Sequence, residues 1–460
     1  MFVTLLVMTL AWGTFAFGGV YPWAYVPLLI SCALVGAFGL IIGRQSSAIS
    51  RNAPFVAALA AIFVAALLQL LPLPPVALAA VSPATDPFAR ATDLTAAAVW
   101  RPLSIYPAAT GRSLFMLAAL VVFFLGLLKA FSRYSAIQVG KALVVLGVVL
   151  AVVGIVQKAT LGADVWGGMK IYGFWRPRYN LVTPFGPFVN KNHFAGWMAM
   201  VIPLTLGVMG GVLASSARYV RADARSQMLW FSTREGGQFL LLGFSALLMT
   251  AAAFMTLSRS GIGSLLVTVP LIGVVATAGH ASRRLRVAIT SVLVLLLLGG
   301  AVWAGTNATL TRLAEGSETL AFRLAIWRDA MTVFRDFPIT GTGLNTFGAA
   351  TLVYQTANRN MHFQEAHNEY LQLLAEGGLL LAIPIVIAMA ALVRGIVRRF
   401  QSSDDPEVYW LRVGAVGGLV AIALQSLVEF SLQMPGNAAL FVVLLAIALH
   451  TSRKVSTTAR

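Results

Sequence analysis

One histidine and several arginines in this chain are of the residue types that a phosphate-displacing reaction requires. His367 stands in the segment EAHNEYLQLLAEGG, where an apolar run begins. Histidine is a natural general base, because its ring gains and loses a proton near neutral pH. Arginine donates paired hydrogen bonds to phosphate oxygens. The combination predicts that His367 accepts a proton while arginines neutralise a departing phosphate. Alternatively, His367 only caps or packs the start of a helix.

Arg259 is the most informative of these arginines. It stands in the sequence LSRSG, in a turn of about four residues between two apolar runs. An arginine at that place is costly unless it is paired or faces a polar cavity. Ser258, Ser260 and Gly261 favour a tight polar turn that suits an anion. The alternative is an interface anchor whose guanidinium extends to lipid headgroups.

The segment 322–337 has apolar residues at helical spacing, which predicts an amphipathic helix on a membrane surface. Its apolar stripe consists of Phe322, Ile326, Ala330, Val333, Phe334 and Phe337. Arg328 and Arg335, seven residues apart, share another face, and Arg323 is offset from them. These arginines either touch lipid phosphates or clamp a lipid-linked phosphate at the bilayer surface.

Other polar residues are further candidates for binding a substrate. Arg176 and Arg178 stand in YGFWRPRYN, and Lys191 stands in FVNKNHFAG. Glu369 and Tyr370 stand where the apolar run after the histidine begins. Glu369 orients an arginine or a sugar hydroxyl in one interpretation, and in the other it is only a helix N-terminal charge.

Local signals also mark helix ends and turns. Asn192 opens an apolar run, so N-capping is its expected role rather than catalysis. Glu376 is expected to orient an arginine or a hydroxyl, or to be a buried ion-pair partner. Pro338 is expected to end the amphipathic helix, and Gly341 and Gly343 permit a tight turn after it.

Several chemistries have no motif in this sequence. There is no H-E-x-x-H, no paired-cysteine metal site, no Walker motif and no dinucleotide-binding glycine pattern. The single cysteine, Cys32, cannot form an intrachain disulfide. No Asp-x-Asp occurs in the segments expected outside the membrane. We therefore expect no metal and no cofactor, and arginines would have to neutralise a diphosphate leaving group.

The composition requires a membrane. Of the 460 residues, 58% are hydrophobic and only 11% are charged, whereas a soluble domain has roughly 25% charged residues. The apolar runs are continuous, which predicts membrane-spanning helices. Twelve candidate spans cover 2–18, 24–43, 53–71, 112–130, 139–158, 192–213, 238–257, 262–279, 287–305, 374–393, 409–430 and 435–451.

The basic residues predict the orientation of these spans. Lysines and arginines concentrate in every second connection and at the C-terminus: 44–51, 129–141, 218–234, 283–286, 394–399 and 453–460. By the positive-inside rule, these segments and both termini are cytoplasmic. The net charge of +17 thus reflects membrane orientation rather than binding of nucleic acid.

The long connections fall on the other side of the membrane. They cover 72–111, 159–191 and 306–373, and the last is the largest segment outside the spans. Connections of that length are usually functional. We therefore expect a single polytopic domain over residues 1–460, with its chemistry on the non-cytoplasmic side.

The stretch RLAIWRDAMTVFRDFPITGTGLNTF, followed by HNEYLQLLAEGGLL, resembles the core of the O-antigen ligase and O-antigen polymerase superfamily. LSRSG is similar to that family's turn arginine, and FVNKNHFAG is similar to its sixth-span entry. The resemblance covers roughly residues 150–440. The matching positions are Arg323, Trp327, Ala330, Pro338, Gly341, Gly343, Phe347, His367, Glu369, Leu371, Glu376 and Gly377.

The resemblance implies a GT-C-like, inverting, metal-independent glycosyltransferase of the bacterial inner membrane, with a periplasmic active site. The implied donor is a glycan on undecaprenyl diphosphate. A ligase transfers it to a sugar of the lipid A core, a polymerase relative transfers it to another lipid-linked glycan, and a third branch glycosylates protein hydroxyls. In this interpretation His367 is the base and Arg259 assists the diphosphate.

A transporter or flippase for a lipid-linked glycan is the rival from another class. It would explain the spans and a basic cavity equally well. However, it predicts ionisable residues distributed through the midplane and two pseudo-symmetric halves. Here the charges lie mostly at the outer boundary of the predicted membrane, and one connection is far larger than the rest.

Overall fold

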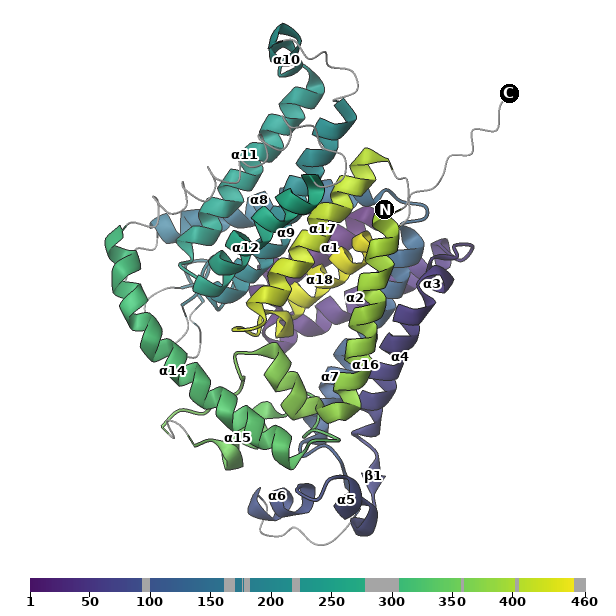
Figure 1. Cartoon of the computed structure of the whole chain (residues 1–460), viewed down its shortest axis with the longest axis vertical. Coiled ribbons are helices and arrows are strands. Elements are labelled where there is room, and N and C mark those ends of the chain that lie inside the picture. The colour runs from purple at the N-terminus through teal and green to yellow at the C-terminus, as the bar shows by residue number, and fades with distance from the viewer. Residues whose placement is uncertain are drawn as a thin grey trace.

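The computed structural model shows a bundle of helices (Figure 1), and the only sheet in its described part has two short strands. The described residues are 1–92, 100–160, 170–175, 177, 183–216, 224–277, 306–356, 360–401 and 405–450.

The elements before residue 225 are α1 (Phe2–Phe15), η1 (Phe17–Gly19), α2 (Pro22–Ile42), α3 (Ala48–Arg51), α4 (Ala53–Leu68), β1 (Pro72–Leu73), α5 (Pro75–Val81), α6 (Thr85–Thr92), β2 (Arg101–Pro102), α7 (Pro107–Ala130), α8 (Ala136–Thr160), α9 (Lys191–Ser216) and α10 (Ala224–Trp230). The later elements are α11 (Arg234–Met255), α12 (Arg259–Thr277), α14 (Thr306–Asp336), α15 (Phe347–Tyr354), α16 (Glu369–Phe400), α17 (Pro406–Gln425), η2 (Ser431–Gln433) and α18 (Pro435–Ala448).

Eleven of the predicted spans coincide with helices to within several residues. Seven of these helices are long and apolar enough to cross a membrane, and α1, α4, α12 and α18 are shorter apolar helices. The predicted span 287–305 lies outside the described residues, so the count of twelve stays a prediction. The chain is therefore an all-α, multi-pass membrane protein.

Connections that were predicted to be cytoplasmic meet at one end of the bundle. Lys129 Nζ donates to the carbonyl oxygen of Arg44 at 3.2 Å, which joins the ends of α7 and α2. Buried Arg412 donates to the carbonyl oxygens of Arg399 and His450, beside the ends of α16 and α18. In Figure 1 this end is uppermost, whereas α5, α6 and α15 lie at the opposite end. The alternation agrees with the charge pattern, and which end faces the cytoplasm stays a prediction.

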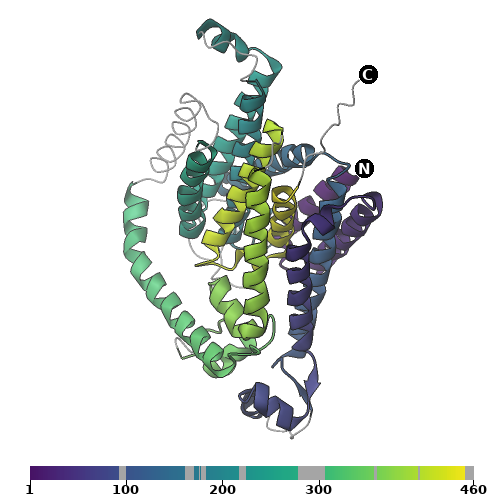
Figure 2. The ribbon, with the colours of Figure 1, turned by 45° about the vertical axis from the view of Figure 1, so that its right-hand side comes forward.

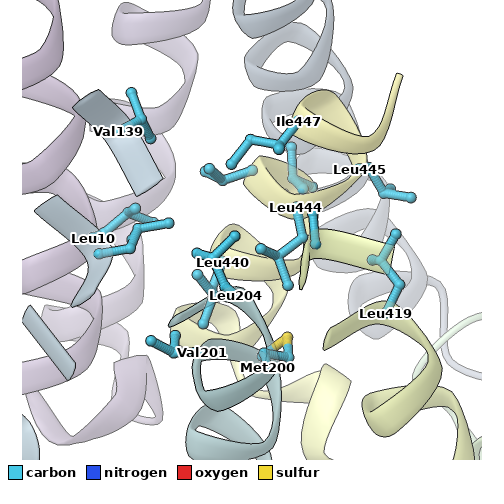
Figure 3. Close-up of a cluster of buried hydrophobic side chains, with 14 of the residues drawn as sticks. Leu10, Val139, Met200, Val201, Leu204, Leu419, Leu440, Leu444, Leu445 and Ile447 are labelled. Atoms are coloured by element: carbon cyan, nitrogen blue, oxygen red, sulfur yellow. The ribbon is translucent and has the colours of Figure 1, made fainter. Parts of the chain in front are cut away.

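The core lies where α9, α17 and α18 pack together. Leucines of α18 such as Leu440 and Leu444 lie beside Met200 and Leu204 of α9 (Figure 3). Helices α9 and α17 can approach closely because Gly207 has no side chain. A Cβ at this position would collide with the α17 backbone. Such close packing of small residues is the usual way in which membrane helices associate. It fixes the start of α9 against the end of α17, where the polar site lies.

The predicted segment 322–337 is part of a longer helix, α14, which runs along one side of the bundle to α15 (Figure 2). Of its predicted apolar stripe, Ile326, Ala330, Val333 and Phe337 are buried. The stripe therefore packs on protein, against α15 and α16. The helix ends at Asp336, two residues before Pro338, which was expected to end it.

The glycine turn after α14 docks on a kink in α16. Gly341 and Gly343 have φ angles of +63° and +107°, as the predicted tight turn requires. Gly378 of α16 has φ +54° and ψ −161°, which only glycine adopts readily. At this kink the backbone N–H groups of Leu379 and Leu380 donate to the segment just after α14. The kink thus fixes the segment after α14 on the bundle.

Candidate active site

Glu429 is the centre of a buried polar cluster. It lies in the turn after α17, and its side chain is only 1% exposed. The predicted span 409–430 had placed it within the membrane, but α17 ends at Gln425. Nη2 of Arg323 lies 2.5 Å from Oε1 of Glu429, and Nδ2 of Asn192 lies 2.7 Å from the same oxygen. A buried carboxylate requires such partners, because burying an unpaired charge is very costly.

The charge state of Glu429 follows from these neighbours. Burial alone would raise the pKa of Glu429. The neighbouring His367, Arg323 and His193 outweigh burial and hold the pKa below its usual value. Glu429 is therefore an ionised carboxylate at neutral pH, and it can stabilise positive charge on an adjacent histidine.

His367 lies directly beside this carboxylate. Its Nδ1 is 3.6 Å from Oε2 of Glu429, and its side chain is 30% exposed. It precedes α16 rather than standing on it, and its φ of +51° is rare for a residue with a side chain. Asn368 caps α16 directly after it, and Trp327 Nε1 donates to the carbonyl oxygen of Ala366 directly before it. The histidine is thus held by its neighbours while its ring stays accessible.

Phe430 separates two histidines. Its ring centroid lies 4.9 Å from that of His367 and 4.8 Å from that of His193, edge-on in both cases. His193 is buried in α9, and its carbonyl oxygen accepts a hydrogen bond from Asn437 of α18. The phenyl ring therefore limits the orientations that the His367 ring can take.

The expected capping role of Asn192 is wrong. Asn190 is the residue whose side-chain oxygen accepts the backbone N–H at the start of α9, at 2.9 Å. The Asn192 side chain instead donates to Glu429. It sits one residue past the first helical position, so its amide is free to point across to the neighbouring turn.

The Arg259 turn is tight and polar, as predicted. Ser258 and Ser260 hydroxyl oxygens lie 3.2 Å apart, and the Arg259 side chain at the start of α12 is exposed. Gln425 Nε2 donates to Ser260 Oγ at 3.5 Å and to the carbonyl oxygen of Asn192 at 2.9 Å. A chain of hydrogen bonds thus connects the Arg259 turn with the residue that holds Glu429.

The other predicted basic residues are distributed around the cluster. Arg323 points to Glu429, whereas Arg328 is exposed on α14, as their predicted offset implies. Lys191 is the first residue of α9 and is partly exposed. Arg176 and Arg178 lie outside the described residues.

A cavity of about 450 Å³ lies between α7, α16, α17 and α18. Glu369, Tyr370 and Gln433 line one end, and the carboxylate of Glu369 accepts hydrogen bonds from the Leu432 backbone and from Gln433. None of the described residues that line it is a lysine or arginine. Apolar side chains line most of the remainder, among them Met116, Leu373, Ile385, Met389, Leu392, Leu419, Phe441 and Leu445. The polar residues Ser113, Asn345, Gln372, Glu376 and Ser426 also line it.

Glu376 is hydrogen-bonded to the glycine turn, and its predicted role in orienting a sugar hydroxyl stays a prediction. Its carboxylate accepts the backbone N–H groups of Asn345 and Phe347, at 2.7 and 3.0 Å. Gln372 donates to it as well. Glu376 therefore anchors the turn after Gly343 to α16, which is a structural role.

A comparison with known protein families matches part of this chain. Residues 244–386 match the family model described as O-antigen ligase. This match confirms the resemblance to the O-antigen ligase and polymerase superfamily and supports a ligase- or polymerase-type enzyme in general terms. The segment that matches the O-antigen ligase family contains Arg259, Arg323 and His367, whereas Asn192 and Glu429 lie outside it. No curated protein matches the chain.

Sequence reasoning missed Glu429. A signal for it was present, because an ionisable residue inside a predicted span is a functional candidate by default. Its partners could not have been named, since Arg323 is 106 residues away and Asn192 is 237 residues away.

Proposed function

We propose that this protein transfers a glycan from undecaprenyl diphosphate to a sugar hydroxyl of the lipid A core. The observation that carries the proposal is the position of His367 beside the buried Glu429–Arg323 pair. His367 and Arg323 also lie in the segment that matches the O-antigen ligase family. The reaction would take place on the periplasmic side of the bacterial inner membrane, in a GT-C-like fold.

In the proposed step, the acceptor hydroxyl oxygen attacks the anomeric carbon from the face opposite the diphosphate. His367 takes the hydroxyl proton as the new carbon–oxygen bond forms. The bond between the anomeric carbon and the diphosphate oxygen breaks, and its electron pair leaves with the diphosphate. Configuration at the anomeric carbon is inverted, because attack and departure occur on opposite faces.

Glu429 would position the base. A carboxylate beside Nδ1 favours the imidazole form with its proton on Nδ1, which leaves Nε2 as the nitrogen that accepts a proton. Glu429 would also stabilise the imidazolium that forms, as the buried aspartate does for the histidine of a Ser-His-Asp triad. The low pKa of Glu429 supports this role, since the group stays ionised.

The leaving diphosphate would be neutralised by arginines rather than by a metal. Arg259 is exposed at the start of α12, Arg328 is exposed on α14, and Lys191 is partly exposed at the start of α9. Removing one such donor typically costs roughly 10²- to 10³-fold in rate. Arg323 is only 20% exposed and mainly neutralises Glu429.

The cavity between α7 and α16–α18 would hold a hydrocarbon chain of a lipid substrate. Its lining is mostly apolar, and Glu369 at its polar end is two residues from His367. A lipid whose head lies at this end would place a sugar close to the base. Glu369 and Tyr370 would then contact sugar hydroxyls.

A reconstituted transfer assay with His367→Ala tests the proposal. We expect turnover to fall by roughly 10²- to 10⁴-fold, as for loss of a general base, while donor binding survives. His362→Ala is the matched control, because His362 is an exposed histidine of the same segment. Near-normal transfer by His367→Ala would refute the role of the base.

The same assay tests the acceptor and the metal. Transfer to lipid A core supports a ligase, whereas transfer only to a second lipid-linked glycan would make the protein a polymerase. EDTA should leave the rate unchanged. Strong inhibition by the chelator would overturn the proposal that arginines act without a metal.

A further inference from the structure

Two segments far apart in the sequence bring aromatic side chains into one cluster. One segment is η1 with the start of α2, and the other is the loop 170–175. Neighbouring ring centroids in the cluster lie 5.2–6.4 Å apart. The members of this aromatic cluster are Phe17, Tyr21, Trp23, Tyr172, Phe174 and Trp175.

The cluster differs from an ordinary belt of interfacial aromatics. In such a belt the polar atoms of tyrosine and tryptophan face water and headgroups. Here Trp175 Nε1 donates to the Tyr21 hydroxyl at 3.2 Å, and the Tyr172 hydroxyl donates to the Phe15 carbonyl oxygen at 2.6 Å. These two polar atoms are bonded to other parts of the chain, and the rings of Phe174, Trp23 and Tyr172 are exposed to the surroundings.

The exposed rings lie on a tight hairpin and at the start of α2. Phe174 is 70% exposed, Trp23 is 48% exposed and Tyr172 is 39% exposed. Ile171 and Trp175 pair through two backbone hydrogen bonds, which closes a tight hairpin. Tyr172 at its tip has a φ of +56°, which is strained for a residue with a side chain. The fold maintains this strain and keeps the Tyr172 and Phe174 rings stacked.

The glycines beside Phe17 pack on segments that border the candidate active site. A side chain at Gly19 would lie 3.2 Å from both the Gly436 nitrogen and Pro435, at the start of α18. Gly18 packs in the same way on Phe188, whose ring contacts Phe194 of α9. These contacts join the cluster to the start of α18, which follows the turn that carries Glu429, and to the start of α9, which carries Asn192.

We propose that the aromatic cluster binds pyranose rings of the glycan beside the transfer site. One face of a pyranose ring carries C–H groups, and these pack on an aromatic face through dispersion and electrostatic attraction. Such stacking needs no particular hydroxyl, so it tolerates the different sugars of a repeating unit. This inference rests on the proposed function, since it takes its glycan from that reaction.

The test uses the full chain in lipid nanodiscs and two variants, Trp23→Ala and Phe174→Ala. A donor that carries a single sugar is compared with a donor that carries several repeats. The length of the acceptor glycan is varied in a separate series, which identifies whether the donor or the acceptor glycan is bound. We expect KM for the long glycan to rise about tenfold, the effect of losing a ring contact. The value of kcat should stay within about twofold, and KM for the single-sugar substrate should not change.

Matched variants decide the outcome. Trp23→Phe and Phe174→Tyr keep a ring and should restore KM. Phe244→Ala removes an exposed phenyl ring of α11 outside the cluster and should have no effect. An unchanged KM for the long glycan, or an equal rise for the single-sugar substrate, would overturn the inference. Absence of transfer by the wild-type chain would instead refute the proposed function.

Binding can also be followed without turnover. The water-soluble glycan released from the donor by mild acid is the probe, and tryptophan fluorescence is the signal. Saturable quenching in the wild-type chain that is lost in Trp23→Ala supports the inference. Equal quenching in both chains overturns it.

Discussion

Arg323 of α14 and Glu429 of the turn after α17 form a buried ion pair between segments 106 residues apart. The pair fixes α14 on the turn that faces His367. Asn192 shares the same carboxylate oxygen, so three helices converge on one buried charge. The position of His367, the proposed base, and the attachment of α14 therefore depend on the same buried carboxylate.

The first prediction concerns the charge of Glu429. Glu429→Gln leaves Arg323 and any imidazolium at His367 without compensation. We expect destabilisation of about 3–5 kcal/mol, as for loss of one partner of a buried pair. Transfer should fall by at least tenfold even at temperatures where the variant stays folded. Thermal unfolding in detergent and the transfer assay measure the two effects.

A double variant separates the two roles of the pair. Arg323→Met with Glu429→Leu removes both charges and should recover stability relative to either single change, because no buried charge is left unpaired. Activity should stay low, since His367 has lost its carboxylate. Recovery of transfer by the double variant would contradict the positioning role of Glu429.

The second prediction contrasts two asparagines at the start of α9. Asn192→Ala removes a donor to Glu429, so transfer should fall about tenfold, for a stability cost of about 1–3 kcal/mol. Asn190→Ala removes only the helix cap and should cost about 1 kcal/mol with transfer retained. Equal transfer by the two variants would show that the Asn192 contact has no role in the reaction.

The sequence predicts the helices of this fold well, because hydrophobicity over about twenty residues is a local property. It also predicts the stripe of α14 and the glycine turn at Gly341, since helical periodicity and positive φ angles leave local signatures. Such signals extend over a few helical turns at most. For this reason they place His367 and Arg323 in the right segments without showing what each side chain contacts.

The contacts of the site depend on how helices pack. Glu429 has its partners on α9 and α14, and no spacing rule connects residues so far apart. The predicted ends of the spans were also inaccurate. The predicted span 409–430 included Glu429, whereas α17 ends at Gln425. Helix ends are the least reliable part of a hydrophobicity pattern. The candidate site residues Asn192, His367 and Glu429 lie at or near such helix ends.

The third prediction concerns the turn that docks on the α16 kink. Gly341→Ala would place a Cβ against the Glu376 carbonyl oxygen at a φ of +63°. We expect a loss of at least about 1–3 kcal/mol. Gly263→Ala is the control, because its Cβ meets nothing within 4 Å in α12 and an alanine favours a helix. Unchanged thermal stability of Gly341→Ala would contradict the docking of this turn.

The last prediction is a pH dependence of stability that arises from Glu365. Burial raises the pKa of Glu365 to about 8. The hydrogen bond from Gln372 lowers the pKa, and the nearby carboxylates Glu376 and Glu369 raise it, but burial is the largest effect. In the unfolded chain the carboxyl has its ordinary pKa of about 4.5. As pH rises between these two values, the unfolded chain releases a proton that the folded chain retains, and the folded state loses stability.

The unfolding temperature should therefore decline as pH rises from 5 to 8 and level off above the folded pKa of about 8. Glu365→Gln cannot titrate, and its amide oxygen can still accept the hydrogen bond from Gln372 Nε2. The unfolding temperature of this variant should change less with pH. The variant should gain most in unfolding temperature, relative to the wild-type chain, at alkaline pH. Thermal unfolding in detergent over this pH range provides the measurement. If the two chains lose stability in parallel, Glu365 is not the group that titrates, and a different buried carboxyl must be responsible.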